Sequence, residues 1–220
     1  MRHGIFIAGT DTEVGKTYIT CRLLEQFRAR GVDAVGMKPV ASGMTLSGDV
    51  MINEDVELIL QASARAVDRE LVNQYSFEPF IAPHLAAWQL GCRIDLKRIR
   101  KAFDELRQSA ELVVVEGAGG LMTPLNADQT YLDLVQQLKL DVVLVVAIRL
   151  GCINHALLTQ EALMQRDIRF SGWVANYVNT EQDRDRAVER SLAERLNAPL
   201  LGVMPRGGPA SRLEIVNLVN

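Results

Sequence analysis

The chain has 220 residues, of which 48% are hydrophobic and 23% are charged. This composition is typical of a folded globular protein and too apolar for a disordered one. The 24 basic and 27 acidic side chains give a formal charge of -3 without a long run of one sign, which argues against broad electrostatic binding of nucleic acid. The longest strongly apolar stretch, Val142 to Ile148, is far shorter than the ~20 residues of a membrane-spanning helix. We therefore expect a protein that acts on a small molecule, without a nucleic-acid or membrane partner.

The first residues and the cysteines favour a cytoplasmic location. The chain opens on a strand-like run, Ile5 to Ala8, without the long apolar segment of an export signal. Three cysteines, Cys21, Cys92 and Cys152, are far apart and form neither a CxxC pair nor an even disulfide framework. Reduced thiols are the expected state.

Predicted strands and helices alternate along the chain. The strands are short, β-branched runs: Ile5–Ala8, Ala34–Met37, Leu112–Val115, Val142–Ala147, Trp173–Ala175 and Leu200–Met204. Apolar residues at three- and four-residue steps predict helices between them, around Ile19–Phe27, Leu96–Leu106 and Val188–Leu196. Continuous apolar strands joined by helices predict an α/β fold, a doubly wound, mostly parallel sheet with helices on both faces. We expect residues 1–220 to form a single domain.

Two irregular regions interrupt this alternation, residues 41–53 and 74–83, where Gly, Ser, Pro and aromatic residues replace periodic apolar ones. They are candidate active-site loops. Polar or glycine-rich segments also follow each predicted strand. Because ligands of open parallel sheets bind beyond the carboxyl ends of the strands, we expect all these segments at one edge of the sheet.

The segment after the first strand, Gly9 to Thr17, is a variant phosphate loop. The usual pattern is GxxxxGK[ST], whereas this chain has one more residue between the glycines. Backbone N–H groups and the helix N-terminus would bind phosphate, Lys16 would neutralise its charge, and the Thr17 hydroxyl would contact Mg²⁺. A purely structural turn is the alternative, but strand, turn and helix are all in place, which favours phosphate binding.

Three charged residues at the same edge have two interpretations each. Glu116 closes a strand and is a metal-ligand candidate, because Mg²⁺ prefers carboxylates and phosphate oxygens; an exposed strand-end acid is the less favoured alternative. Asp55, taken alone, is better explained as an acid that complements a helix N-terminus. Lys38 is either a solvated residue after a strand or a group that stabilises a transferring phosphoryl group.

The segment Gly151 to Asn154 opens a helix and is a second candidate anion site. Ordinary helix capping by Asn154 explains it equally well. The histidines, His3, His84 and His155, show no metal-ligand spacing, and no nucleophile elbow is present.

Five segments carry a more specific signal: Gly9–Thr17, Lys38–Gly43, Val115–Gly120, Leu150–His155 and Gly172–Asn176. In this order and with this spacing they resemble dethiobiotin synthetases over nearly the whole chain. The resemblance implies a P-loop NTPase-like fold and a single ATP-binding synthetase domain. It implies a homodimeric, Mg²⁺-dependent ligase of biotin biosynthesis that uses ATP and CO2 to close a cyclic urea on diaminopelargonic acid. The implied intermediates are a carbamate and a carbamic-phosphoric anhydride.

The resemblance also implies roles for individual residues. Lys16 and Lys38 would stabilise the migrating phosphoryl group, and Thr12 and Ser42 would face the diamine and the carbamate. The remaining implied residues are the phosphate loop, Glu13, Val14, Gly15, Lys16, Thr17 and Tyr18; the Mg²⁺ ligands, Thr17, Asp55 and Glu116; and the backbone near the reacting groups, Gly117, Ala118 and Gly119. This set changes the interpretation of Asp55 from a helix-end acid to a metal ligand.

Two further groups of residues are implied at the ends of the substrates. The adenine base would meet Asn176, Tyr177, Pro205, Arg206 and Gly207. The tail carboxylate of the diamine would be bound across the dimer interface by Leu150, Gly151, Cys152 and Asn154. The segment after Pro205 is shorter than is usual in the family, so Glu214 is only a candidate for the acid that contacts the base.

Two other classes share a phosphate loop. Partition-type ATPases carry a signature lysine where this chain has Asp11, which argues against a nucleotide-driven switch. Amidating synthetases that act on corrinoid precursors need a glutaminase portion with a catalytic cysteine, and this chain has no room for one.

Overall fold

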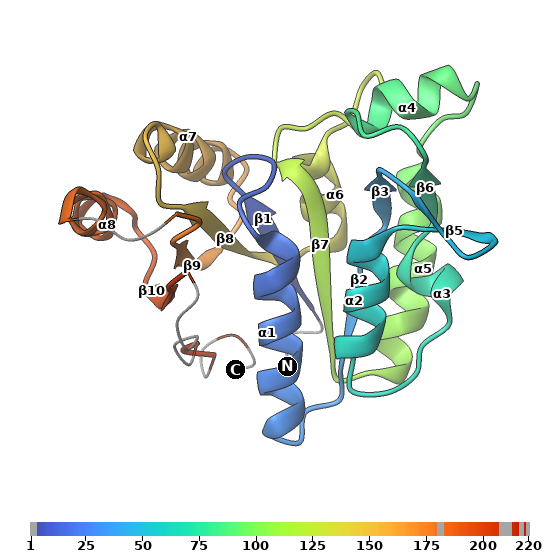
Figure 1. Cartoon of the computed structure of the whole chain (residues 1–220), viewed down its shortest axis with the longest axis horizontal. Coiled ribbons are helices and arrows are strands. Elements are labelled where there is room, and N and C mark those ends of the chain that lie inside the picture. The colour runs from blue at the N-terminus through green and yellow to red at the C-terminus, as the bar shows by residue number, and fades with distance from the viewer. Residues whose placement is uncertain (1–3, 180–182, 207–212, 216–217, 219–220) are drawn as a thin grey trace.

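The computed structural model describes residues 4–179, 183–206, 213–215 and 218. Its centre is a six-stranded sheet in which every neighbouring pair is parallel (Figure 1). In spatial order the strands are β10 (Leu200–Met204), β9 (Phe170–Asn176), β8 (Asp141–Ala147), β1 (Gly4–Gly9), β7 (Leu112–Gly120) and β2 (Ala34–Met37). The predicted strands are all present, and the parallel arrangement is confirmed.

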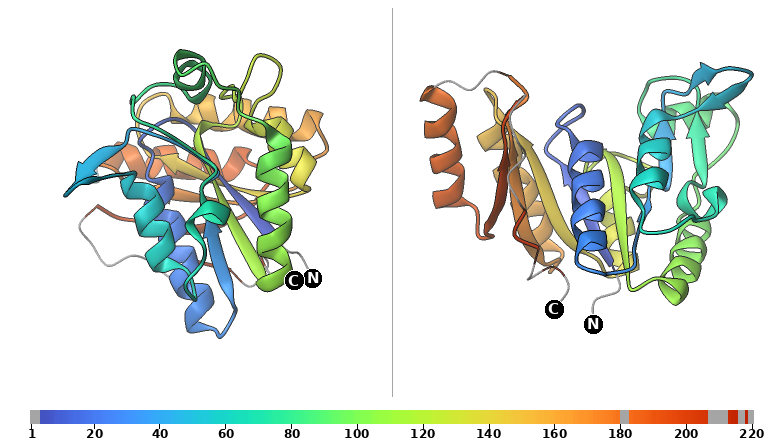
Figure 2. Two further views of the ribbon diagram at one scale, coloured as in Figure 1. Left: turned by 90° about the vertical axis from the view of Figure 1, so that its right-hand side faces the viewer. Right: turned by 60° about the horizontal axis from the view of Figure 1, so that its bottom comes forward.

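Helices cover both faces of this sheet because its strands are apolar on both sides. Helices α1 (Lys16–Ala29) and α2 (Glu54–Ala62) lie on one face, in front of the sheet in Figure 1. The other face packs against α5 (Leu96–Ser109), α6 (Tyr131–Leu138), α7 (Cys152–Gln165) and α8 (Asp183–Arg195). The two layers are also visible in Figure 2.

The irregular regions predicted as loops contain short strands. Strand β3 (Val40–Ser42) pairs with β6 (Tyr75–Phe77), and β4 (Thr45–Ser47) forms a hairpin with β5 (Val50–Ile52). The hairpin is exposed, so it lacks the buried, alternating pattern that identifies strands in a sequence. Two short helices, α3 (Arg69–Val72) and α4 (Pro83–Gln89), complete this side of the molecule.

Strand β7 is longer than predicted, since it continues from Val115 through Glu116 to Gly120. Glycine lowers the strand signal of this stretch, but its backbone still pairs with β1, where Gly9 lies opposite Gly120.

The chain reverses direction across the sheet at β1. After β1 it crosses to β2 on one side, and after β7 it crosses β1 to reach β8 on the other side. Such a reversal opens a crevice beyond the carboxyl ends of the strands. The phosphate loop, Lys38 and the segment after β8 all lie at this edge, as predicted. Among the described residues, no helix is both long and apolar enough to span a membrane.

Candidate active site

The phosphate loop adopts a backbone that few residues other than glycine accept. Gly15 has φ +89° and forms the N-cap of α1, and Glu13 has φ +55°. A Cβ atom on Gly15 would lie 2.2 Å from Nδ2 of Asn176, so glycine is required both by the backbone and by its neighbour. At the other end of the loop, the Thr10 amide donates to the carbonyl of Val145 in β8. The loop is thus held against β8 and β9.

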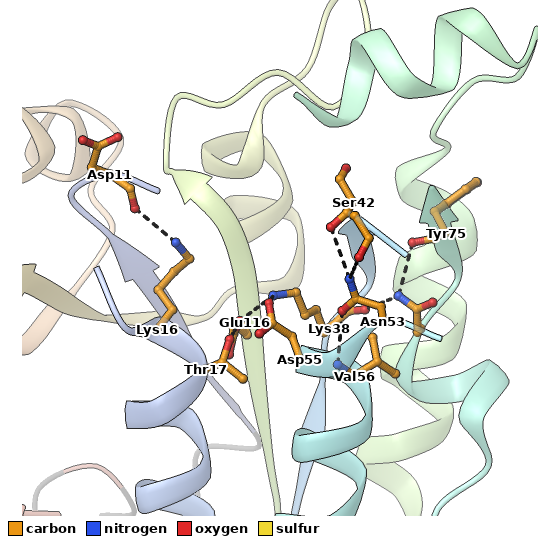
Figure 3. Close-up of polar contacts among 12 residues, drawn as sticks. Asp11, Lys16, Thr17, Lys38, Ser42, Asn53, Asp55, Val56, Tyr75 and Glu116 are labelled. Atoms are coloured by element: carbon orange, nitrogen blue, oxygen red, sulfur yellow. Dashed lines mark hydrogen bonds and ion pairs between the residues drawn. The ribbon is translucent and has the colours of Figure 1, made fainter. Parts of the chain in front are cut away.

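Lys16 is a nearly buried cation at the first position of α1. Its side chain is 7% exposed, and its Nζ donates to the main-chain oxygen of Asp11 at 3.2 Å (Figure 3). Burial lowers the pKa of Lys16 to about 8, although the charge of Glu116 partly opposes the shift. Within the described part of the chain, Lys16 forms no ion pair with a carboxylate. A buried ammonium without a carboxylate partner is well suited to bind a phosphate.

Four side chains from four separate segments of the chain meet beside Lys16. Glu116 Oε1 accepts hydrogen bonds from Lys38 Nζ at 2.7 Å and from Thr17 Oγ1 at 2.8 Å. Lys38 also pairs with Asp55 at the start of α2 (Figure 3). Burial alone would lower the pKa of Lys38, but the two carboxylates outweigh it and raise that pKa. Burial would likewise raise the pKa of Asp55, but Lys38 outweighs it and lowers the value. Lys38 and Asp55 are therefore both charged at neutral pH.

The other oxygen of Glu116 is unpaired as far as the described residues are concerned. Glu116 is 0% exposed, and its Oε2 accepts no hydrogen bond in the part of the chain that the structure describes. A buried, unpaired carboxylate oxygen is costly unless a cation or a water satisfies it. Among the described residues, no group of three or more His, Cys, Asp or Glu side chains could hold a metal by itself. Two carboxylates and a hydroxyl instead suit Mg²⁺, which usually takes one or two carboxylates and completes its shell with phosphate oxygens and water.

These residues line a pocket of about 620 Å³. Of the residues selected in the sequence, it brings together Thr12, Glu13, Gly15, Lys16, Thr17, Tyr18, Lys38, Ser42, Asp55, Glu116, Ala118 and Gly119. Ser42 lines the pocket, and its Oγ atom is buried with no hydrogen-bond partner among the described residues. Phe80 and Ile81 add apolar side chains to the lining of the pocket.

Two of the selected residues lie close to the pocket without lining it. Val14 is fully buried in the core beside α1. Gly117 is buried against Phe6, whose ring would be 2.7 Å from a Cβ atom at this position. Gly117 therefore allows β7 to pack closely on β1, which places Ala118 and Gly119 at the pocket.

Asn53 is a site residue that the sequence motifs did not reveal. Its Oδ1 accepts from the amide of Val56 and caps α2, while its Nδ2 donates to the carbonyls of Ser42 and Gly43 at 3.2 and 3.1 Å. It thereby fixes Asp55 and Ser42 relative to each other. An asparagine before an acidic helix start is a recognisable N-cap, but the contact with Ser42 depends on the tertiary fold.

Asn176, which is predicted to contact the adenine base, lies beside the phosphate loop. Asn176 Nδ2 donates to the carbonyl of Val14 at 2.8 Å, so its Oδ1 stays available to a ligand. The Tyr177 side chain is buried in the core and its hydroxyl contacts Glu189 at 2.5 Å, so only its backbone could meet a nucleotide. Pro205 is partly exposed and Arg206 is exposed. Gly207 lies outside the described residues.

The segment after β8 forms a separate, exposed turn. Gly151 has φ +91° and is the N-cap of α7, Leu150 is fully exposed, and Asn154 is exposed without capping the helix through its side chain. The Cys152 side chain is buried, which raises the pKa of its thiol, and its backbone amide donates to the carbonyl of Arg149 at 3.1 Å. None of these residues lines the 620 Å³ pocket.

The chain is similar to known proteins both in sequence and in fold. A family model described as an AAA domain matches residues 3–211. An ATP-dependent dethiobiotin synthetase BioD of Nitrosospira multiformis is 49% identical over 93% of this chain and 89% of its own length. The Aromatoleum aromaticum protein of the same name is 43% identical over 96% and 93%. The septum site-determining protein MinD of Pyrococcus horikoshii, solved with Mg-ADP, covers 92% of this chain and 81% of its own with a TM-score of 0.56.

The similarity to MinD, at 16% identity, establishes a P-loop NTPase-like fold and nothing further. The relatives at 43–49% identity match over 93–96% of this chain and 89–93% of their own length. The chain therefore belongs to the family of ATP-dependent dethiobiotin synthetases.

Proposed function

We propose that this protein is the ligase that converts diaminopelargonic acid, CO2 and ATP into dethiobiotin, ADP and phosphate in biotin biosynthesis. The observation that carries the proposal is the convergence of Lys16, Lys38, Thr17, Asp55 and Glu116 on one pocket beside the phosphate loop. Such a cluster can bind a triphosphate and stabilise the charge on the phosphoryl group during its transfer. Phosphoryl transfer is catalysed mainly by positioning and by this charge stabilisation. The family of the chain supplies the identity of the acceptor.

The phosphate loop would bind ATP through the backbone of Glu13 to Tyr18 and the N-terminus of α1. Lys16 would face the terminal phosphate. Lys38, which is held by Asp55 and Glu116, would stabilise the negative charge of the migrating phosphoryl group. Mg²⁺ would be held by Thr17, Asp55 and Glu116, and it would neutralise charge on the phosphate oxygens. The unpaired Oε2 of Glu116 supports this role.

The diamine would react in the same pocket. One amine takes up CO2 as a carbamate, a carbamate oxygen attacks the γ-phosphorus of ATP, and ADP leaves. The second amine then attacks the carbonyl carbon of the mixed anhydride, and phosphate leaves with an oxygen that came from CO2. Thr12, Ser42, Ala118 and Gly119, which line the pocket, would orient these groups. No protein nucleophile is needed.

The tail carboxylate of the substrate would bind at the N-terminus of α7, in a homodimer that brings Leu150 to Asn154 to the partner's pocket. In such a dimer the fully exposed Leu150 would pack against the partner. Asn176, with Pro205 to Gly207, would read the adenine base, and Glu214 is the candidate acid. Because the Tyr177 side chain is buried, its contribution would come from the backbone.

The cell compartment proposed is the cytoplasm, and residues 1–220 are proposed to act as a single ATP-binding synthetase domain. All three cysteines are free thiols in the structure, as a reducing compartment requires. The continuous six-stranded sheet, with the phosphate loop, Lys38 and the segment after β8 at one edge, supports the one-domain interpretation.

The substitution Gly15→Ala is expected to weaken ATP binding at least tenfold. A Cβ atom at φ +89° is strained, and it would also collide with the Asn176 amide and displace it from Val14. Gly31→Ala is the matched control, because Gly31 has φ +77° but a Cβ atom there would have no neighbouring atom within 4 Å. Titration with a fluorescent ATP analogue should show weak binding for Gly15→Ala and normal binding for Gly31→Ala. Equal affinities in the two variants would contradict the assigned contact.

Isotope transfer tests the proposed reaction directly. The purified protein is incubated with ATP, Mg²⁺, the diamine and ¹⁸O-labelled bicarbonate, and the products are analysed by mass spectrometry. We expect the cyclic urea, together with one ¹⁸O in the released phosphate. Urea without label in the phosphate would refute the mixed anhydride, and absence of urea would refute the reaction.

A further inference from the structure

The main chain of Lys38 is held by a side chain that lies outside the pocket. Asn73 is the residue at which α3 ends, two positions before β6 begins. Its Nδ2 donates to the carbonyl oxygen of Lys38 at 2.7 Å and to that of Tyr75 at 3.2 Å. The Lys38 amide in turn donates to the carbonyl of Val72 at 2.9 Å. Both main-chain polar groups of Lys38 are therefore bonded to the segment between α3 and β6.

The contact depends on the chemistry of asparagine. Nδ2 of Asn73 faces two carbonyl oxygens, which can only accept, and its Oδ1 accepts from Ser76 Oγ at 2.5 Å. These partners fix the orientation of the amide. An aspartate of the same size would place an oxygen, without a proton to donate, against both carbonyls. The main chain of Asn73 is held as well, since its amide donates to the carbonyl of Arg69 at 2.8 Å.

Lys38 lies where the chain leaves the central sheet and enters a smaller one. Strand β2 ends directly before it, and β3, which pairs with β6, begins two residues after it. The carbonyl of Pro39, between the two strands, accepts from the amides of Gln74 and Tyr75 at 3.1 and 3.0 Å. The Asn73 side chain adds the hydrogen bond that comes before these. It thereby fixes the point from which the Lys38 side chain starts.

The carboxylates that hold Nζ of Lys38 have a second proposed task. Asp55 and Glu116 are also the proposed Mg²⁺ ligands, so the oxygens that accept from Nζ would be shared with a metal ion. A constraint on the main chain of Lys38 does not depend on this sharing. Because Lys38 is 4% exposed, its side chain is packed among neighbours, and a displaced main chain would carry Nζ with it.

We propose that Asn73 is a positioning residue for phosphoryl transfer: it holds the main chain of Lys38 in the place from which Nζ reaches the migrating phosphoryl group. This inference rests on the proposed function, because it takes Lys38 to stabilise that group. Asn73 does not line the pocket and does not touch the reacting atoms. It acts through Lys38.

Steady-state kinetics give the first test. Asn73→Ala should lower kcat about tenfold, which is less than the ~10²-fold that a misplacement of 1 Å can cost. The hydrogen bonds of Asn73 go to Lys38 and to residues 69–76, away from the phosphate loop. The KM of ATP should therefore change by less than about twofold. Asn73→Asp keeps the size of the side chain and the acceptor for Ser76 but lacks the donor, so its kcat should fall at least as far.

A double-mutant cycle shows whether Asn73 acts through Lys38. Lys38→Met removes the ammonium whose position Asn73 is proposed to set. In this background Asn73→Ala should cost less than about twofold in the residual rate of urea formation, because the two substitutions remove the same effect.

Hydrogen exchange of the ligand-free protein tests the contact without any turnover. A peptide that covers residues 34–42 should exchange about fivefold faster in Asn73→Ala than in the wild type, as the loss of about one hydrogen bond implies.

Asn126→Ala is the matched control for both measurements. Asn126 Nδ2 donates to the carbonyl of Ile94 at 2.9 Å and joins residues 32 apart in the sequence, as Asn73 joins residues 35 apart. Asn126 does not line the 620 Å³ pocket and is not bonded to Lys38. Its kcat, and the exchange of residues 34–42, should match those of the wild type.

The outcomes separate this proposal from the proposed function. If the wild type forms no cyclic urea, the proposed function fails and this inference fails with it. If urea forms but Asn73→Ala has normal kcat, or leaves the exchange of residues 34–42 unchanged, only the positioning role is wrong. A tenfold loss that persists in the Lys38→Met background would also overturn it, because Asn73 would then act by another route. An equal loss in Asn126→Ala would reduce the effect to general stability.

Discussion

Lys16→Met is expected to reduce turnover by at least 10² to 10³, because it removes the cation that would face the terminal phosphate. The same substitution should leave the folded protein as stable as the wild type, or more so. Methionine keeps a long apolar stem in a site that is 7% exposed, and it removes a buried ammonium that no carboxylate of the described residues pairs with. Lys16→Ala should be equally inactive but is a poorer comparison, since it also leaves a cavity.

The stability difference should depend on pH in a defined direction. The pKa of Lys16 falls from 10.5 to about 8 on folding, so between these values the unfolded chain binds a proton that the folded chain has released. Stability of the wild type relative to Lys16→Met should therefore rise from pH 8 to pH 10.5. Urea unfolding without nucleotide measures this difference, and steady-state kinetics measure turnover. Near-normal turnover in the folded variant would refute the phosphate-loop assignment.

Glu116→Gln should lower kcat about 100-fold and raise the Mg²⁺ concentration needed for half-maximal rate at least tenfold. The amide cannot supply the anionic oxygens that a divalent cation prefers, and it leaves Lys38 with Asp55 as its single carboxylate partner. Excess Mg²⁺ should restore only part of the activity, because the alignment of Lys38 is also lost. Glu116→Ala should behave in the same way.

Glu57→Gln is the control for this substitution. Glu57 also lies near the site, on α2, and pairs with a cation, Arg69, but it does not line the pocket. Its Mg²⁺ dependence should match that of the wild type. A Glu116→Gln variant with an unchanged Mg²⁺ requirement would show that Glu116 orients Lys38 without contributing to a metal site.

Much of this site could be predicted because its signals are local. The glycines of the phosphate loop and the apolar strand before it are dictated by backbone geometry, which the sequence displays directly. The position of Glu116 follows from the apolar run, Leu112 to Val115, that it ends. The structure adds that the residue is fully buried, which excludes the interpretation as an exposed strand-end acid.

Other features depend on contacts between distant segments and have no local signal. Asp11 and Arg149 are 138 residues apart in the sequence, and they form an ion pair because β1 and β8 are neighbours in the sheet. Asn53 reaches Ser42 through the tertiary fold, and Tyr177 is buried because α8 covers it with Glu189. The hairpin of β4 and β5 is exposed, so no hydrophobic pattern marks it.

The most direct test of the central claim is phosphate release from ATP and Mg²⁺, measured with and without the diamine and bicarbonate. The account predicts that release requires both co-substrates and that one phosphate appears for each cyclic urea formed. The phosphate pocket would then serve the ligase reaction. Hydrolysis of ATP at the same rate without the diamine, and without a urea product, would contradict the account and point to a nucleotide-driven switch on the same fold.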